Sequence, residues 1–200
     1  MLANRTRPGR QAGTSMIEVL ISIVIVVLGL LGLAGLQSRA QLAEAESFQR
    51  AQAVILLQDM VERIQSNKKA PSIAYDTAGV PLGTGAGAEQ DCSALTGADL
   101  DKCEWHNSLL GAAESAGGLK VGAMIGARGC VQVVRAAMPR EFLVSVAWQG
   151  LNSTIDPQAS QCGAGQYAPP ETRRLLTATV VIGCLQNNSA TGACITTVAP

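Results

Sequence analysis

The sequence predicts an α+β fold in which a long N-terminal helix packs on a small antiparallel β-sheet. An apolar run over residues 16–36 continues into residues 37–65, which contain no proline or glycine and many good helix formers. Beyond residue 130 the apolar side chains recur with a period of two, which is typical of half-buried strands. An apolar stripe on the second half of the helix would cover one face of that sheet.

Composition narrows the class of function. Fifteen basic and fifteen acidic side chains cancel, and an isoelectric point of ≈ 6.6 argues against electrostatic binding of nucleic acid. Aromatic residues make up 3% of the chain and there is one histidine, which is little for an enzyme pocket. The sequence contains no G-x-S-x-G elbow, Walker loop or H-E-x-x-H motif. We expect no enzymatic activity, no cofactor, no metal site and no nucleic-acid partner.

The N-terminus has the charge pattern of a membrane topology signal. Residues 1–13 hold three arginines and no acidic residue. Residues 16–36 contain only two polar side chains, Glu18 and Ser22, and are long enough to cross a bilayer. Under the positive-inside rule, the arginines keep the N-terminus in the cytoplasm and the rest of the chain on the far side.

The junction Gly13–Leu20, GTSMIEVL, resembles the type IV prepilin signal: a short basic leader ending in glycine, an apolar helix, and a glutamate five residues after the glycine. The resemblance implies that a prepilin peptidase cuts between Gly13 and Thr14 and methylates the new N-terminal amine of Thr14. It also implies that Glu18 acts in assembly. The sequence departs from major pilins at Thr14, where they usually carry phenylalanine; minor pilins vary at this position.

Glu18 has two interpretations. A carboxylate near a membrane segment is unfavourable by a few kcal/mol unless it is paired or close to the interface. Glu18 therefore either stays solvated at the cytoplasmic headgroup level or pairs with the methylated ammonium of Thr14, from its own chain or a neighbour. The leader and the glycine favour the pairing.

The resemblance divides the chain into four parts: a leader 1–13, a transmembrane and filament-core helix 14–36, an amphipathic continuation 37–66, and a globular head 67–200. In the continuation, the spacing predicts an apolar stripe, with Leu56 and Met60 beside it, made of Val54, Leu57, Val61 and Ile64. The whole helix would run for about 50 residues, or about 75 Å.

Two segments follow the helix. Asn67–Gly97 contains prolines and a glycine-rich stretch, which predict an irregular surface loop. From Thr96 the pattern predicts a second helix that begins with a Thr96/Asp99 capping box and ends at Gly117-Gly118. We expect Trp105 to anchor this helix on the sheet and His106 to lie on its surface. Its apolar face would comprise Leu100, Cys103, Leu110 and Ala113.

Three strands are predicted, at Cys130–Ala136, Glu141–Gln149 and Arg173–Cys184. The tight link between the first two predicts that they pair antiparallel. The long segment Asn152–Pro170 is predicted to be a surface excursion.

Six cysteines indicate an oxidising compartment and three disulfides. They are Cys92, Cys103, Cys130, Cys162, Cys184 and Cys194. Closure of small loops favours Cys92–Cys103 and Cys184–Cys194, which leaves Cys130–Cys162, although six cysteines allow many other pairings. There is no C-x-x-C pair, so a zinc site is poorly supported.

Three features look like the PilV-type minor pilins: GLLGLAGLQ after the signal, the Asp101/Cys103/Trp105 helix, and the strand Val144–Trp148. The resemblance implies a minor pilin that primes a type IV pilus, supports twitching motility and is located at the pilus tip. The partners would be other minor pilins, the major pilin, the prepilin peptidase and the pilus assembly machinery. The protein would pass once through a bacterial inner membrane, with its head in the periplasm, and then join the extracellular pilus.

Two alternatives remain. A type II secretion pseudopilin shares the signal and the helix. A membrane-anchored periplasmic binding module would never polymerise and would keep residues 1–13.

Overall fold

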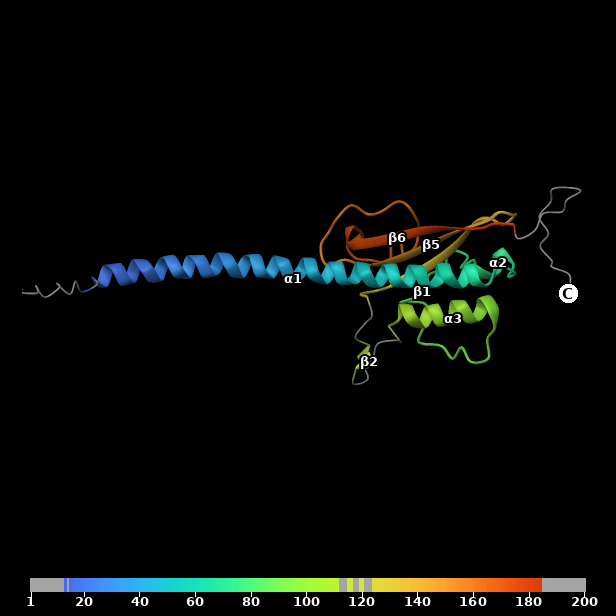
Figure 1. Cartoon of the computed structure of the whole chain (residues 1–200), viewed down its shortest axis with the longest axis horizontal. Coiled ribbons are helices and arrows are strands. Elements are labelled where there is room, and N and C mark those ends of the chain that lie inside the picture. The colour runs from blue at the N-terminus through green and yellow to red at the C-terminus, as the bar shows by residue number, and fades with distance from the viewer. Residues whose placement is uncertain (1–12, 14, 112–114, 117–118, 121–123, 185–200) are drawn as a thin grey trace, which may run out of the picture. The chain divides into compact units, whose positions relative to one another are not determined.

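The computed structural model describes residues 13, 15–111, 115–116, 119–120 and 124–184. It has the α+β architecture predicted from the sequence, with a long N-terminal helix and a four-stranded antiparallel sheet (Figure 1). The chain divides into two compact units, Met1–Glu44 and Ala45–Pro200. The helix α1, Met16–Ser66, belongs to both.

The second part of α1 buries a stripe that differs from the predicted one. Ala53, Leu57, Met60 and Ile64 are buried in the core of the head. Leu57 and Ile64 were predicted correctly, but Val54 is 36% exposed and Val61 is only partly buried. A helix turns by about 100° per residue, so a shift of one position moves a side chain off the buried line.

The main sheet has the strand order β1-β4-β5-β6, and every neighbouring pair is antiparallel. Its strands are β1, Leu82–Gly83; β4, Arg128–Arg135; β5, Arg140–Gln149; and β6, Arg173–Ile182. The predicted strands and the antiparallel pairing of the first two are confirmed, except that β6 ends before Cys184. A separate pair joins β2, Ser115–Ala116, to β3, Leu119–Lys120.

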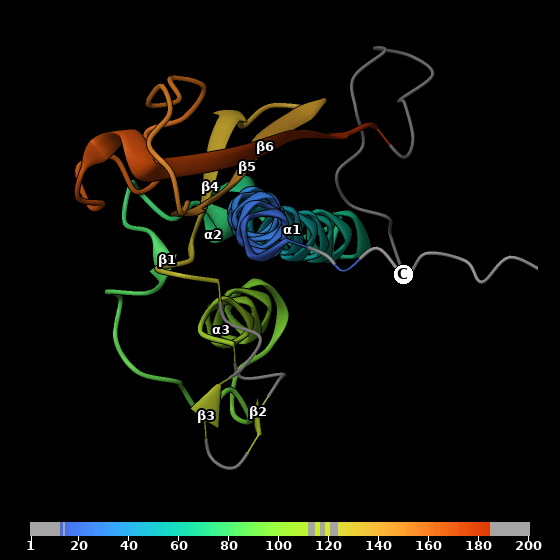
Figure 2. The same ribbon diagram turned by 90° about the vertical axis from the view of Figure 1, so that its left-hand side faces the viewer.

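The core lies between the sheet, the C-terminal part of α1 and the helix α3, Gly97–Leu109 (Figure 2). Trp105 of α3 is fully buried, and its Nε1–H donates to the Leu56 carbonyl of α1 at 2.8 Å. Its ring also covers Gly129 of β4, where an added Cβ would lie 2.3 Å from Trp105 Cη2. Trp105 therefore anchors α3 on the sheet, as expected, and on α1 as well.

The buried face of α3 also differs from the predicted one. Its buried residues are Ala98, Cys103, Trp105, His106 and Leu109, whereas Leu100 and Leu110 are half-buried and Ala113 lies outside the described residues. Thr96 is the N-cap residue but its side chain makes no capping hydrogen bond, so the capping box was wrong. The helix stops at Leu109 because Gly111, with φ of 80°, turns the chain well before Gly117-Gly118.

Part of the predicted loop after α1 is ordered structure. Residues Ser72–Tyr75 form the short helix α2, and β1 pairs with β4. Gly83 is needed at this edge, since its φ is 90° and an added Cβ would lie 2.6 Å from the Ala127 carbonyl oxygen. The backbone of Thr77 also bonds to Val131, so this segment covers one edge of the sheet.

The predicted surface excursion after β5 covers the second face of the sheet. Cys162 and Tyr167 pack with Ala147 in a separate small core, bordered by Cys130 and Leu175. The segment ends in the short 3-10 helix η1, Pro170–Thr172, which leads into β6. The excursion is therefore part of the packed head, because the outer face of β5 also carries apolar side chains that need a cover.

Candidate functional site

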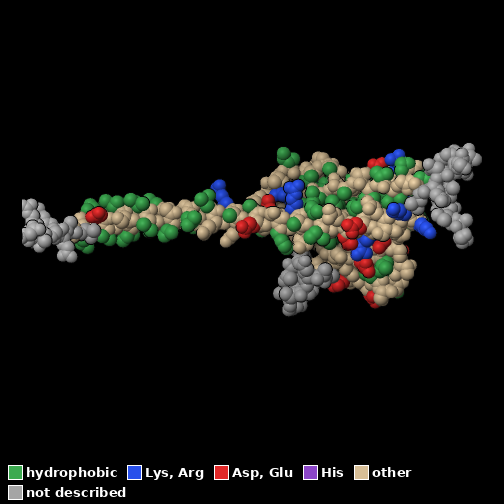
Figure 3. Space-filling view, in the orientation of Figure 1, with side chains coloured by type: hydrophobic (Ala, Val, Ile, Leu, Met, Phe, Trp, Pro, Cys, Tyr) green, Lys and Arg blue, Asp and Glu red, His purple; other side chains and the backbone are tan. Residues whose placement is uncertain are grey.

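The first part of α1 exposes apolar side chains around its whole circumference. Every described residue up to Glu44 is exposed, and an 18-residue window has a mean hydropathy of 2.9 with none of it buried. Figure 3 shows apolar side chains along the visible face of this part of the helix. In the described part of the chain this is the one helix long and apolar enough to cross a membrane. Such a surface is compatible with membrane anchoring.

Glu18 lies in the first turn of α1 and is exposed. The Ser22 hydroxyl donates to the Glu18 backbone carbonyl at 2.7 Å and does not touch the carboxylate. Near the N-terminus of a helix, a carboxylate is favoured by the helix dipole. The predicted partner, Thr14, lies outside the described residues, so the pairing stays a prediction. Gly13 is exposed, and no atom of the described residues lies within 4 Å of the position that a Cβ would take there.

The structure joins two of the cysteine pairs that small-loop closure and elimination favour. Cys92 bonds to Cys103 and ties the segment before α3 to that helix. Cys130 bonds to Cys162 and ties β4 to the excursion over the outer face. Cys184 is disulfide-bonded, and its expected partner Cys194 lies outside the described residues.

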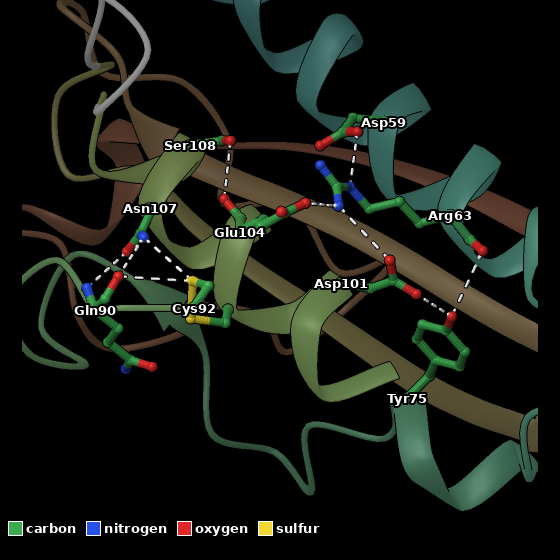
Figure 4. A network of polar contacts seen from close by, with 10 residues as sticks. Asp59, Arg63, Tyr75, Gln90, Cys92, Asp101, Glu104, Asn107 and Ser108 are labelled. Atoms are coloured by element: carbon green, nitrogen blue, oxygen red, sulfur yellow. Dashed lines mark hydrogen bonds and ion pairs between the residues drawn. A yellow bond between two sulfur atoms is a disulfide. The ribbon is translucent and has the colours of Figure 1, made fainter. Parts of the chain in front are cut away.

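Arg63 of α1 joins this helix to α3 (Figure 4). Its guanidinium donates to Asp59 Oδ1 at 2.8 Å and to Glu104 of α3, and lies 3.6 Å from Asp101 Oδ1. Burial alone would lower the pKa of Arg63, but the carboxylates of Glu104 and Asp59 raise it overall. Arg63 therefore remains a cation that fixes α3 beside the last turns of α1.

Tyr75 of α2 completes this group. It is buried, and its hydroxyl donates to Asp101 Oδ2. Burial, followed by the hydrogen bond to Asp101, raises the pKa of Tyr75 above its ordinary value. The phenol therefore stays protonated and links α2 to α3.

His106 is buried, contrary to the predicted surface position. Its Nδ1 accepts the Gly83 N–H at 3.0 Å, and its Nε2–H donates to the Ala88 carbonyl at 3.0 Å. These partners assign the neutral tautomer with the proton on Nε2. The ring borders an open pocket of ≈ 450 Å³, but both nitrogens are hydrogen-bonded, so its role is to hold the segment from Gly83 to Ala88.

Sequence reasoning missed several polar residues that organise the head. His106 follows Cys103 by three positions, so helical spacing already placed it near the buried face. Arg173 is 2% exposed and bonds to Asp156 Oδ1 at 2.7 Å, but no local pattern marks that distant partner. Glu46 of α1 contacts residues that follow β5, and this contact was missed because no local pattern marks those distant partners either. No group of three or more potential metal ligands occurs among the described residues.

Comparison with known proteins gives one family match. A family model described as Type IV pilin Tt1218-like matches residues 35–103, about a third of the chain. The match spans all of α1 from Gly35 onward, the segment with α2 and β1, and the first half of α3. No curated protein and no solved structure matches. The family match supports a relationship to type IV pilins and a structural role.

Proposed function

We propose that this protein is a minor pilin that primes assembly of a type IV pilus and is located at its tip. The observation that carries the proposal is the first part of α1, which is apolar on every side and continues into a folded head. The match of residues 35–103 to a type IV pilin family supports it. The PilV-like features of the sequence favour a minor pilin over a major pilin. A pilin has no catalytic role.

Processing precedes assembly in this proposal. A prepilin peptidase removes residues 1–13 by cutting between Gly13 and Thr14, and methylates the amine of Thr14. The protein first spans the inner membrane once, with its head in the periplasm. Because the apolar surface of α1 has no cover among the described residues of its own unit, it can leave the lipid only if similar helices replace the lipid. Other minor pilins and the major pilin would provide those helices.

In this proposal Glu18 acts in the assembly of the filament. Its carboxylate pairs with the methylated Thr14 amine once the helix leaves the membrane, which offsets the unfavourable removal of its charge from water. The variant Glu18→Ala should be inserted and cut normally, because its segment is more apolar, but should enter filaments poorly. Normal incorporation would support the solvated carboxylate instead.

Two alternatives share most of the same features. A type II secretion pseudopilin would have the same signal and helix but build a periplasmic pseudopilus. A non-polymerising anchored module would retain residues 1–13, so the N-terminal sequence of the membrane-extracted protein separates it from any pilin. The variant Gly13→Leu adds a sharper test, since it should leave a longer, unmethylated precursor in the membrane.

Deletion of the gene tests the priming role. Surface pili and twitching motility should fall, while the major pilin continues to accumulate in the membrane. Complementation with the wild-type gene should restore both, and complementation with the Gly13→Leu variant should restore neither. Normal piliation in the deletion strain would contradict priming and favour a secretion or accessory function.

A further inference from the structure

Two turns of α1 within the head, residues 45–52, contribute little apolar burial. Ala53 is the first fully buried residue of the helix, and Phe48 is 56% exposed. Gln49 and Gln52 are half-buried, and Gln49 Oε1 is a buried atom with no hydrogen-bond partner among the described residues. A buried oxygen without a hydrogen-bond partner is unfavourable for stability, because its desolvation is not compensated. Apolar packing therefore does not explain why these turns lie on the head.

Glu46 provides the polar contacts that hold these turns. Its Oε1 accepts the backbone N–H groups of Leu151 at 3.2 Å and Asn152 at 3.1 Å. It also accepts hydrogen bonds from Asn152 Nδ2 at 3.4 Å and from Arg174 Nη2 at 3.1 Å. Within the described residues, no other side chain of residues 45–52 forms a hydrogen bond or ion pair to the head.

The receiving side of this contact is held in place without Glu46. Arg174 donates to the Asn152 carbonyl and to Thr154 Oγ1, both at 2.7 Å. Gly150 makes room for the guanidinium, since an added Cβ would lie 2.6 Å from Arg174 Cζ. The donors for Glu46 are therefore preorganised, and opening this contact need not unfold the turn that carries them.

We propose that Glu46, Leu151, Asn152 and Arg174 form a latch that closes residues 45–52 onto the head. Its opening releases these two turns together, while the stripe from Ala53 to Ile64 stays packed. Segments with few buried contacts are the ones that open locally in folded proteins. Eight helical residues span about 12 Å, so opening lengthens the part of α1 that is free of the head by about that amount. This property belongs to the head alone and does not depend on filament formation.

Hydrogen exchange of the full chain in detergent micelles tests the latch. The amide protons of Leu151 and Asn152 point at Glu46 Oε1, so their exchange requires the latch to open. In Glu46→Ala, both amides should exchange at least about tenfold faster, because a charged acceptor is lost. The carboxamide resonances of Gln49 should shift at the same time. Amides at the centre of β5, Val144 and Val146, should keep their protection.

Two further variants keep the test specific. Glu46→Gln retains the shape and one acceptor oxygen without the charge, so the two amides should exchange at a rate between wild type and Glu46→Ala. Glu62→Ala is the matched control, because Glu62 is an exposed carboxylate on the same helix and forms no hydrogen bond or ion pair among the described residues. It should leave Leu151 and Asn152 unchanged.

Unchanged exchange at Leu151 and Asn152 in Glu46→Ala would overturn the latch. Equal acceleration at Val144 and Val146 would also overturn it, since that result means global and not local opening. Acceleration at the two amides without any shift of the Gln49 resonances would show that residues 45–52 do not move, and would reject their release as a unit.

Discussion

Residues 16–44 and residues 45–66 belong to one uninterrupted helix, yet their side chains have different surroundings. In the first part every described side chain is exposed, whereas the second part buries four side chains in the core and ties Glu46 and Arg63 to other elements. The first part is rich in Val, Ile and Gly, which are weaker helix formers than the Ala, Gln, Glu and Arg that are frequent in the second part. Tertiary packing in the head therefore stabilises the second part, whereas no described side chain of the first part has such packing within its own unit.

The largest expected effect comes from truncating one apolar side chain in each part. Met60→Ala removes a fully buried side chain and should lower the free energy of unfolding of the head by about 2–5 kcal/mol. Leu28→Ala changes a side chain that is 64% exposed and should alter it by less than about 0.5 kcal/mol. Chemical unfolding in micelles, followed by near-UV circular dichroism of the two tryptophans, measures both values. Equal losses would contradict the division of α1.

Removal of one disulfide should destabilise the head without changing the first part of α1. The double variant Cys92→Ser/Cys103→Ser should destabilise the head by about 2–4 kcal/mol, since the cross-link no longer restricts the unfolded chain. The fold should persist, because His106 and Asn107 still bond to the segment from Gly83 to Gln90. Helicity of residues 16–44, measured by amide exchange in the same micelles, should not change. A loss of helicity there would show that the two parts are coupled.

A smaller effect is expected at the contact between α3 and α1. Trp105→Phe keeps an aromatic ring over Gly129 but removes the Nε1–H that bonds to the Leu56 carbonyl. Loss of one such hydrogen bond should lower stability by about 0.5–1.5 kcal/mol, with a further loss from the smaller ring. Amide exchange near Leu56 should increase more than exchange in β6. The opposite order would place the main role of Trp105 on the sheet.

The smallest effect concerns pH. Partial burial would raise the pKa of Glu46, but the Asn152 N–H and Arg174 outweigh it and hold that pKa below its ordinary value. A lowered pKa means that this group stabilises the folded head above the pKa of the unfolded chain. The contribution is lost as pH falls through the folded value. The stability difference between wild type and Glu46→Gln should therefore shrink on acidification below about pH 4. A constant difference would show that charge is unimportant at this position.

The sequence predicted the elements better than their contacts. The course of α1 and the positions of β4, β5 and β6 follow from local periodicity, which needs no knowledge of distant partners. The buried stripe of α1 was misplaced because apolarity ranks Val54 above Ala53. In the structure Ala53 is the fully buried residue of the two. Hydropathy alone does not indicate which of two neighbouring apolar residues faces the core.

The polar contacts of the head were missed for a different reason. His106 is held by the backbone N–H of Gly83 and the backbone carbonyl of Ala88. Every residue type carries a backbone carbonyl, and nearly every one an N–H, so the sequence does not mark these partners. Glu46 meets Leu151, Asn152 and Arg174 across more than a hundred residues of chain. Such pairs become visible only when the topology brings the segments together. The predicted roles of Gly13, Thr14 and Glu18 depend on partners outside the chain.

The two consecutive arginines at the start of β6 have a consequence for protein engineering. Successive side chains of a strand point to opposite faces, so Arg173 reaches the excursion on the outer face and Arg174 reaches Glu46 on the helix side. A one-residue insertion or deletion between Thr172 and Leu175 would exchange the two faces and leave both guanidinium groups without their acceptors. The exposed residue Gln166 donates its backbone N–H to the Gly163 carbonyl and forms no hydrogen bond with β6 among the described residues. Epitope tags or labels are therefore better placed there than at Gln158 or Ala159, which lie between Asp156 and Ser160, two residues that accept hydrogen bonds from Arg173.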